Sequence, residues 1–257
     1  MLKQVASLMN RFMIAALLCM LFSCQDMPTE EEAIKKNQEG INHMNEGKYE
    51  LALADFSEAV RNPKLTLISK GTIYRNIALT YHELNKLDSS IHFSTLAAKC
   101  YKKNSYDYLV NMANVDILTG KTSVALLKLL KAAGMEPGDL SVNNILGLIY
   151  LGDYGEEFAD PEKALTYNKK AFEISNSRIT EDILGRNYYD LGKYDLAEMH
   201  YQRIHEQYPN ELNYTLNMGM IKYKLKKTMD AELLFSQVIA GDSSYKETIE
   251  TFKDNNR

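Results

Sequence analysis

The side chains best suited to chemistry, five histidines and three cysteines, do not gather into a recognisable site along the 257-residue chain. His200 and His205 are five residues apart, so on a helix they would point about 140° apart and could not share a metal ion. Cys100 lies between Lys99 and Tyr101 with no histidine beside it, which is typical of a small packing residue. We therefore expect neither a bound metal nor thiol chemistry.

Known catalytic motifs are incomplete or absent. Gly120-Lys121-Thr122 ends like a phosphate-binding loop, but that loop needs a glycine five residues before Gly120, where this chain has Val115. Gly47-Lys48 and Gly192-Lys193 repeat the same pair elsewhere, which indicates a recurring turn. The patterns Cys-x-x-Cys, His-Glu-x-x-His and Gly-x-Ser-x-Gly do not occur. The sequence therefore predicts no enzymatic activity and no cofactor.

The overall composition is that of a globular protein with a small acidic surplus. Hydrophobic residues make up 45% and charged residues 25%, with 13 glycines and five prolines, which excludes a collagen-like or low-complexity chain. Thirty Lys and Arg against 34 Asp and Glu give a net charge of −4. The chain as a whole thus lacks the basic character of a nucleic-acid binder, and we expect no nucleic-acid partner.

The N-terminal segment predicts export. An uncharged apolar run extends from Phe12 to Phe22, with Arg11 directly before it and Lys3 further upstream. A transmembrane helix needs about 20 apolar residues, so this run is too short to span a membrane but has the length of a signal peptide. The next feature, Leu21-Phe22-Ser23-Cys24, resembles the lipobox of bacterial lipoproteins, in which the signal is cut just before a cysteine that carries lipid.

The lipobox resemblance implies a signal peptide over 1–23, lipidation at Cys24 and an acidic tether over 24–32. It also implies an outer-membrane lipoprotein, on the periplasmic face or the cell surface, that meets the membrane through its lipid. A plain signal peptide that leaves Cys24 as an ordinary thiol is the alternative. The acidic residues of the tether suit either a solvated spacer or a surface-export signal.

The rest of the chain repeats a unit of about 34 residues. Residues 178–211 carry the pattern most fully, in Leu184, Gly185, Tyr188, Gly192, Tyr194, Ala197, Tyr201 and Pro209. This pattern resembles the tetratricopeptide repeat (TPR). Equivalent residues recur in units at 33–66, 71–104, 106–139, 140–177, 178–211 and 212–245, followed by a polar, helical tail over 246–257. The fourth unit, with a longer inter-helix loop, is similar to a Sel1-like repeat.

The TPR resemblance implies an all-α fold, a right-handed superhelical solenoid of about six helix-turn-helix repeats. In that family the first helices line a concave groove that binds a peptide or a helix. The matching positions here include Asn37, Arg75, His82, Asn114, Asn144, Arg186, Tyr189, Met220 and Tyr223. Arg and Tyr side chains are frequent anchors of protein interfaces.

These features together predict a membrane-anchored adaptor of the bacterial cell envelope whose groove binds a protein or peptide partner. Two alternatives remain open on the sequence alone. One is a surface lipoprotein that captures glycans or peptides, although the absence of tryptophan argues against glycan capture. The other is a regulatory subunit of an envelope enzyme.

Overall fold

The computed structural model describes residues 29–256, which form helices joined by turns and contain no strand. The predicted signal peptide, Cys24 and the first part of the tether lie outside the described residues. The chain divides into two compact units, residues 1–102 and 103–257. Of the helices within 29–256, none has the length and apolar character that crossing a membrane requires.

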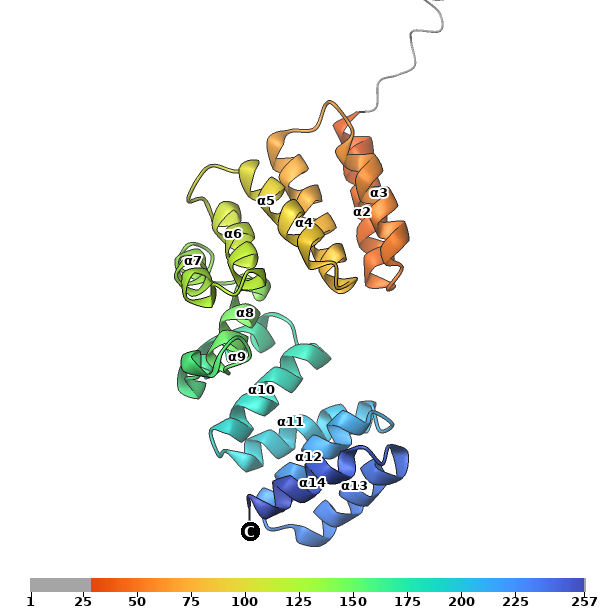
Figure 1. Ribbon diagram of the computed structural model, residues 1–257, viewed down its shortest axis with the longest axis vertical. Helices are drawn as coiled ribbons and strands as arrows, with labels where there is room; N and C mark the ends of the chain where they lie inside the picture. The colour runs from red at the N-terminus through yellow and green to blue at the C-terminus, as the bar shows by residue number, and fades with distance from the viewer. Residues whose placement is uncertain (1–28, 257) are drawn as a thin grey trace, which may run out of the picture. The chain divides into compact units, whose positions relative to one another are not determined.

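The first unit contains two helical hairpins, coloured red to yellow in Figure 1. Its helices are α2 (Glu30–Asn45), α3 (Tyr49–Val60), α4 (Leu67–Glu83) and α5 (Leu87–Lys99). Helix α2 pairs with α3, α4 pairs with α5, and α3 packs against α4. Phe56, Ile73 and Ile77 form the centre of their shared core.

The first helix of each hairpin in this unit begins earlier than the repeat pattern predicts. Helix α2 starts inside the predicted tether, because Thr29 caps it and forms a capping box with Glu32. The acidic residues Glu30 to Glu32 therefore occupy a first helical turn, where negative charge is favourable. Helix α4 starts four residues before the expected boundary at 71, capped by the Thr66 side chain.

The second unit contains four hairpins and a final helix, coloured yellow-green to blue in Figure 1. The hairpins are α6 (Tyr106–Leu118) with α7 (Thr122–Met135), α8 (Leu140–Tyr150) with α9 (Pro161–Ile174), α10 (Arg178–Asp190) with α11 (Tyr194–Gln207), and α12 (Leu212–Lys224) with α13 (Thr228–Gly241). A 3-10 turn, η1 (Glu156–Phe158), lies in the longer connection between α8 and α9. Each of the six predicted repeats thus contains one pair of helices.

Small residues let the two helices of each hairpin approach closely. The repeat position that Ala197 occupies is fully buried in every hairpin, as Ala52, Ser90, Ala125, Ala164, Ala197 and Ala231. On the first helix, Gly185 leaves a notch that the Tyr201 ring fills, since a Cβ atom at Gly185 would lie 2.9 Å from that ring. Gly219 and Phe235 repeat this arrangement in the last hairpin, at 2.8 Å.

The C-terminal segment is a packed helix. Helix α14 (Tyr245–Asp254) has a polar outer surface, and its Ile249 is buried in a cluster with Phe235 and Val238. Its Phe252 ring also contacts Tyr223, with the ring centroids 5.5 Å apart. The segment expected to be a polar tail therefore closes the end of the last repeat, as capping helices do in repeat proteins.

Candidate protein-binding site

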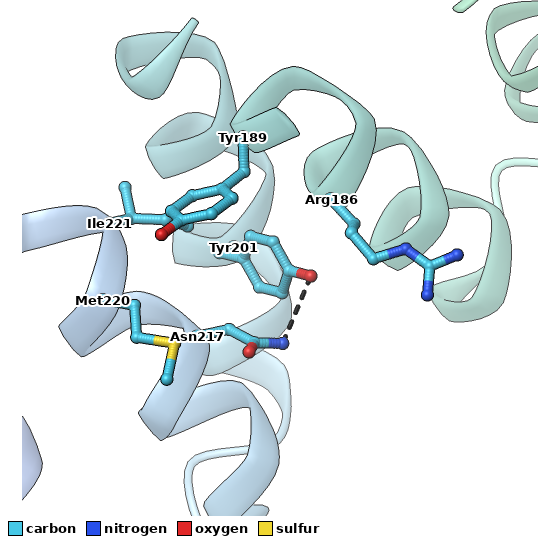
Figure 2. A pocket seen from close by; sticks show the side chains of 6 residues that line it. All are labelled: Arg186, Tyr189, Tyr201, Asn217, Met220 and Ile221. Atoms are coloured by element: carbon cyan, nitrogen blue, oxygen red, sulfur yellow. Dashed lines mark hydrogen bonds between the residues drawn. The ribbon is translucent and has the colours of Figure 1, made fainter. Parts of the chain in front are cut away.

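A small cavity opens between three helices of the second unit (Figure 2). Its lining comes from α10, α11 and α12, through Arg186, Tyr189, Tyr201, Asn217, Met220 and Ile221. Its volume is about 70 Å³, enough for several water molecules. A cavity of this size has room for the end of one aliphatic side chain and none for a drug-sized ligand.

Two tyrosines form the wall of the cavity and are fixed by their neighbours. The Tyr201 hydroxyl donates to Asp182 Oδ1 at 2.7 Å and accepts a hydrogen bond from Asn217 Nδ2 at 3.2 Å (Figure 2 shows the latter). Burial raises the pKa of Tyr189 to about 12, and burial beside Asp182 raises the pKa of Tyr201 as well. Both phenols therefore stay protonated and uncharged at neutral pH.

Arg186 forms the rim of the cavity, with its guanidinium pointing away from the Tyr189 ring (Figure 2). Its Nη2 donates to Asp153 Oδ2 at 2.7 Å, which links the hairpins of repeats four and five. Its Nε is buried and makes no hydrogen bond within residues 29–256. A buried donor without a partner is costly to the stability of the fold.

A second carboxylate, Asp190 at the end of α10, lies close to Arg186 and keeps part of its surface exposed. Loss of hydration raises the pKa of Asp190, an effect that the positive charge of Arg186 opposes and the negative charge of Asp153 reinforces. The site therefore combines an apolar cavity with the partly exposed guanidinium of Arg186 and a carboxylate of raised pKa. This arrangement suits recognition of a polypeptide, since it offers a side-chain socket beside groups that bind the main chain.

Asn37 does not belong to an open binding surface. Its side chain is buried, and its Oδ1 accepts a hydrogen bond from Asn76 Nδ2 at 2.9 Å. The pair joins α2 to α4, so Asn37 holds two neighbouring repeats together. The position that the TPR pattern assigns to the groove is here occupied by a contact between first helices.

The remaining predicted groove residues do not join the cavity. Arg75 is half-buried and His82 is exposed, both on α4 of the first unit. In the second unit, Asn114 on α6 is half-buried, and the Oδ1 of Asn144 on α8 is buried without a hydrogen-bond partner in the described part of the chain. Tyr223 packs on the Phe235 and Phe252 rings beneath α14.

Three lining residues were not among the predicted groove positions. Tyr201 comes from a second helix, and the sequence pattern placed it in the hairpin core. It reaches the cavity because Gly185 lets its ring pass over α10. Asn217 and Ile221 precede and follow the predicted Met220 on α12, and only the packing of α12 on α11 shows that they contribute. In residues 29–256 no group of three or more His, Cys, Asp or Glu side chains is placed to hold a metal ion.

Comparisons with known proteins bear on the fold. No curated protein sequence matches the chain significantly. The family model "Tetratricopeptide repeat" matches residues 183–211, and no catalytic family is indicated.

Several solved structures have a similar fold at low sequence identity. TTC0263, a thermophilic TPR protein of Thermus thermophilus, is 18% identical, with a TM-score of 0.56 over 74% of this chain and 98% of its own. YrrB, described as a TPR protein with an unusual peptide-binding site, is 18% identical, with a TM-score of 0.57 over 77% of this chain and 97% of its own. The APC/C hetero-tetramer Cut9-Hcn1 contains a chain that is 17% identical, with a TM-score of 0.65 over 82% of this chain and 40% of its own. These findings confirm the predicted fold class: the chain has the all-α fold of tetratricopeptide-repeat proteins, and residues 183–211 match the repeat itself.

Proposed function

We propose that this protein is a membrane-anchored adaptor of the bacterial cell envelope that holds a segment of a protein partner against α10 and α12. The observation that carries the proposal is the cavity that Arg186 and Tyr189 form with Met220. It lies between the first helices of two neighbouring repeats, with α11 packed against both of them. The unusual peptide-binding site described for YrrB supports the same use of a TPR scaffold.

The cavity restricts the chemistry of the partner segment. Its volume favours one small aliphatic side chain. A main-chain carbonyl oxygen of the same segment would accept a hydrogen bond from the partly exposed guanidinium of Arg186. An extended segment, or one turn of a helix end, presents both groups together.

The decisive variant removes the rim and one wall of the cavity while preserving the hairpin. In Arg186→Ala with Tyr189→Leu, leucine keeps apolar contact with the core, and the lost ion pair with Asp153 is partly exposed and worth at most about 1 kcal/mol. We expect a nearly normal melting temperature but partner capture reduced by about tenfold or more, since Arg and Tyr are frequent interface anchors.

The matched control is Arg75→Ala with His82→Ala, which alters two predicted groove residues that line no such cavity. Capture that stays normal in the cavity variant, or that falls equally in the control, would contradict the proposed site. The assay uses chemically cross-linked cell envelopes and an affinity tag on the chain, with each bound protein quantified by mass spectrometry.

The proposed anchor is the lipid on Cys24, placed in the outer membrane on its periplasmic face or the cell surface. Its support is the Leu21-Phe22-Ser23-Cys24 sequence after a short apolar run. We expect Cys24→Ser to abolish palmitate incorporation and to leave either an unprocessed precursor or a protein that carbonate washing releases. Cys100→Ser should change neither property. A Cys24→Ser protein with a cleaved signal that remains membrane-bound would exclude the lipid anchor.

A further inference from the structure

The outward side of α7 differs in composition from the other second helices of its unit. Helix α7 reads TSVALLKLLKAAGM and contains no Asp or Glu, whereas α9, α11 and α13 each contain at least two. Its exposed residues include Val124, Leu127, Leu130 and Met135, and Leu127 is 70% exposed. A surface helix normally turns polar side chains toward water, so these exposed apolar side chains indicate a binding surface.

The charged side chains within α7 are all lysines, and the exposed carboxylate of Glu136 follows at its C-cap, next to Met135. Lys131 is exposed next to Leu127 and Leu130, and Lys121 is exposed at the N-cap. Neither lysine makes an ion pair within the described part of the chain. Lys128 alone is neutralised, through a salt bridge with Asp116. Val124, Leu127 and Lys131 follow one another at spacings of three and four residues, so they share one face.

Exposed apolar residues on α11 and α13 have the opposite electrostatic setting. On α13, Met229 and Leu233 are 87% and 62% exposed but alternate with Asp230 and Glu232. On α11, Leu196 follows Asp195 directly. Phosphate groups would repel carboxylates at these places. Among the second helices of the hairpins in this unit, α7 is therefore the one suited to a lipid surface, which is anionic at the headgroups and apolar beneath them.

We propose that the outward side of α7 binds an anionic lipid surface. Leu127 and Val124 would enter the boundary between headgroups and acyl chains, while Lys121 and Lys131 would meet lipid phosphates. Two features favour lipid over a protein surface. The face carries lysines that make no ion pair within residues 29–256, and α7 has none of the Arg, Tyr or Trp side chains that anchor protein interfaces.

The contact is small and suits a role in orientation. A single short helix face binds membranes weakly, but a tethered protein experiences a high local concentration of lipid. A chain anchored through Cys24 would thereby hold α7 against the membrane and fix the direction in which the cavity between α10 and α12 faces. The inference about α7 does not depend on that anchor and is tested without it.

The test uses the chain from residue 24 onward with Cys24→Ser, which keeps every residue that the structure describes and carries no lipid. The probes are vesicles of equal parts phosphatidylglycerol and phosphatidylcholine, and vesicles of phosphatidylcholine alone, separated from free protein by flotation. We expect binding to the anionic vesicles only, weakened by added salt. Leu127→Ser with Lys131→Glu should lower the vesicle-bound fraction by about tenfold or more.

The control for apolar exposure is Met229→Ser with Leu233→Ser, which should leave vesicle binding unchanged. Circular dichroism and melting temperature establish that each variant is folded, and Lys131→Glu alone gives a second variant that touches no packed residue. Absence of binding to anionic vesicles, equal binding to neutral vesicles, or binding that survives both α7 variants would overturn the proposal. Loss of partner capture in the cavity variant with normal vesicle binding would separate the two sites.

Discussion

At the turn between the two helices of the last repeat, a lysine takes a conformation that other repeats assign to glycine. Lys226 has a φ of 61°, in the left-handed region, whereas the equivalent Gly192 has a φ of 69°. A side chain in this region costs about 1–2 kcal/mol because its Cβ crowds the carbonyl oxygen. The sequence pattern does not mark this position as a turn, since it relies on glycine there.

Replacing that lysine gives a prediction with a definite sign. Lys226→Gly should raise the free energy of unfolding by about 0.5–1 kcal/mol, because the relief of strain exceeds the extra chain entropy of glycine. Gly192→Ala should lower it by about 1 kcal/mol, although a Cβ there would touch nothing within 4 Å. Urea unfolding, monitored by circular dichroism, measures both changes in the free energy of unfolding. A destabilised Lys226→Gly protein would show that the lysine side chain stabilises the turn.

A second residue-scale prediction concerns the buried histidine of repeat five. His200 Nδ1 lies 3.2 Å from Glu181 Oε1 and 3.0 Å from Arg203 Nη2, and its ring stacks on Tyr188 and meets Phe172 edge-on. Burial lowers the pKa of His200, and the positive charge of Arg203 acts in the same direction, whereas Glu181 opposes both. The folded state therefore prefers the neutral imidazole.

The sign of the pH effect follows from the unfolded chain. Below its ordinary pKa of 6.5 the unfolded histidine takes up a proton that the folded state resists. The stability of wild-type protein should thus fall as the pH decreases from 6.5 toward the folded pKa. His200→Gln should be less stable at pH 7 but lose less stability on acidification. Urea unfolding midpoints of both proteins, measured across this pH range, test the prediction. If stability depends on pH in the same way in both proteins, groups other than His200 cause the effect.

At the scale of elements, the repeat pattern predicts helices better than it predicts their starts. Constant offsets of small and aromatic residues indicate the hairpins, because close helix contact needs them. The repeat pattern did not predict the early start of α2, because the acidic polar run at this place suggests a tether. The capping pair Thr29 and Glu32 was the available signal. For α4 the corresponding signal was Thr66.

Side-chain placement within the site was less predictable. Arg186 and Tyr189 follow from their repeat positions, and both line the cavity. Asn37 also holds a position that the repeat pattern assigns to the groove but is buried, because its partner Asn76 comes from the next repeat. The contribution of Tyr201 depends on the notch at Gly185, which only the packed hairpin shows. Repeat position thus predicts which helix face a residue occupies, and contacts between repeats decide its exposure.

The packing of α14 supplies a prediction for a whole element. Ile249→Ala removes the buried side chain that joins α14 to Phe235 and Val238, and such truncations typically cost about 2–5 kcal/mol. Hydrogen exchange should rise in α12, α13 and α14 and stay low in α6 and α7, because repeats contact only their neighbours. Thr248→Ala, at an exposed position on the same helix, serves as the control. Normal protection of α13 in Ile249→Ala would show that α14 does not stabilise the last repeat.

At the scale of the whole molecule, the proposed functions are distributed along the chain. The anchor is assigned to Cys24, the lipid-facing surface to α7 and the partner site to α10 and α12. Such a distribution matches an adaptor, which links surfaces without carrying out a reaction. The central claim within this scheme is that a protein segment occupies the cavity beside Met220.

Photo-crosslinking from that cavity tests the claim most directly. A benzoylphenylalanine at position 220, introduced into the full chain in living cells, should give a discrete protein adduct under ultraviolet light. The adduct should be lost when Arg186→Ala and Tyr189→Leu are added. The same probe at position 229, exposed on α13 away from the cavity lining, should not give it. No adduct from position 220, or an identical adduct from position 229, would contradict the proposed binding site.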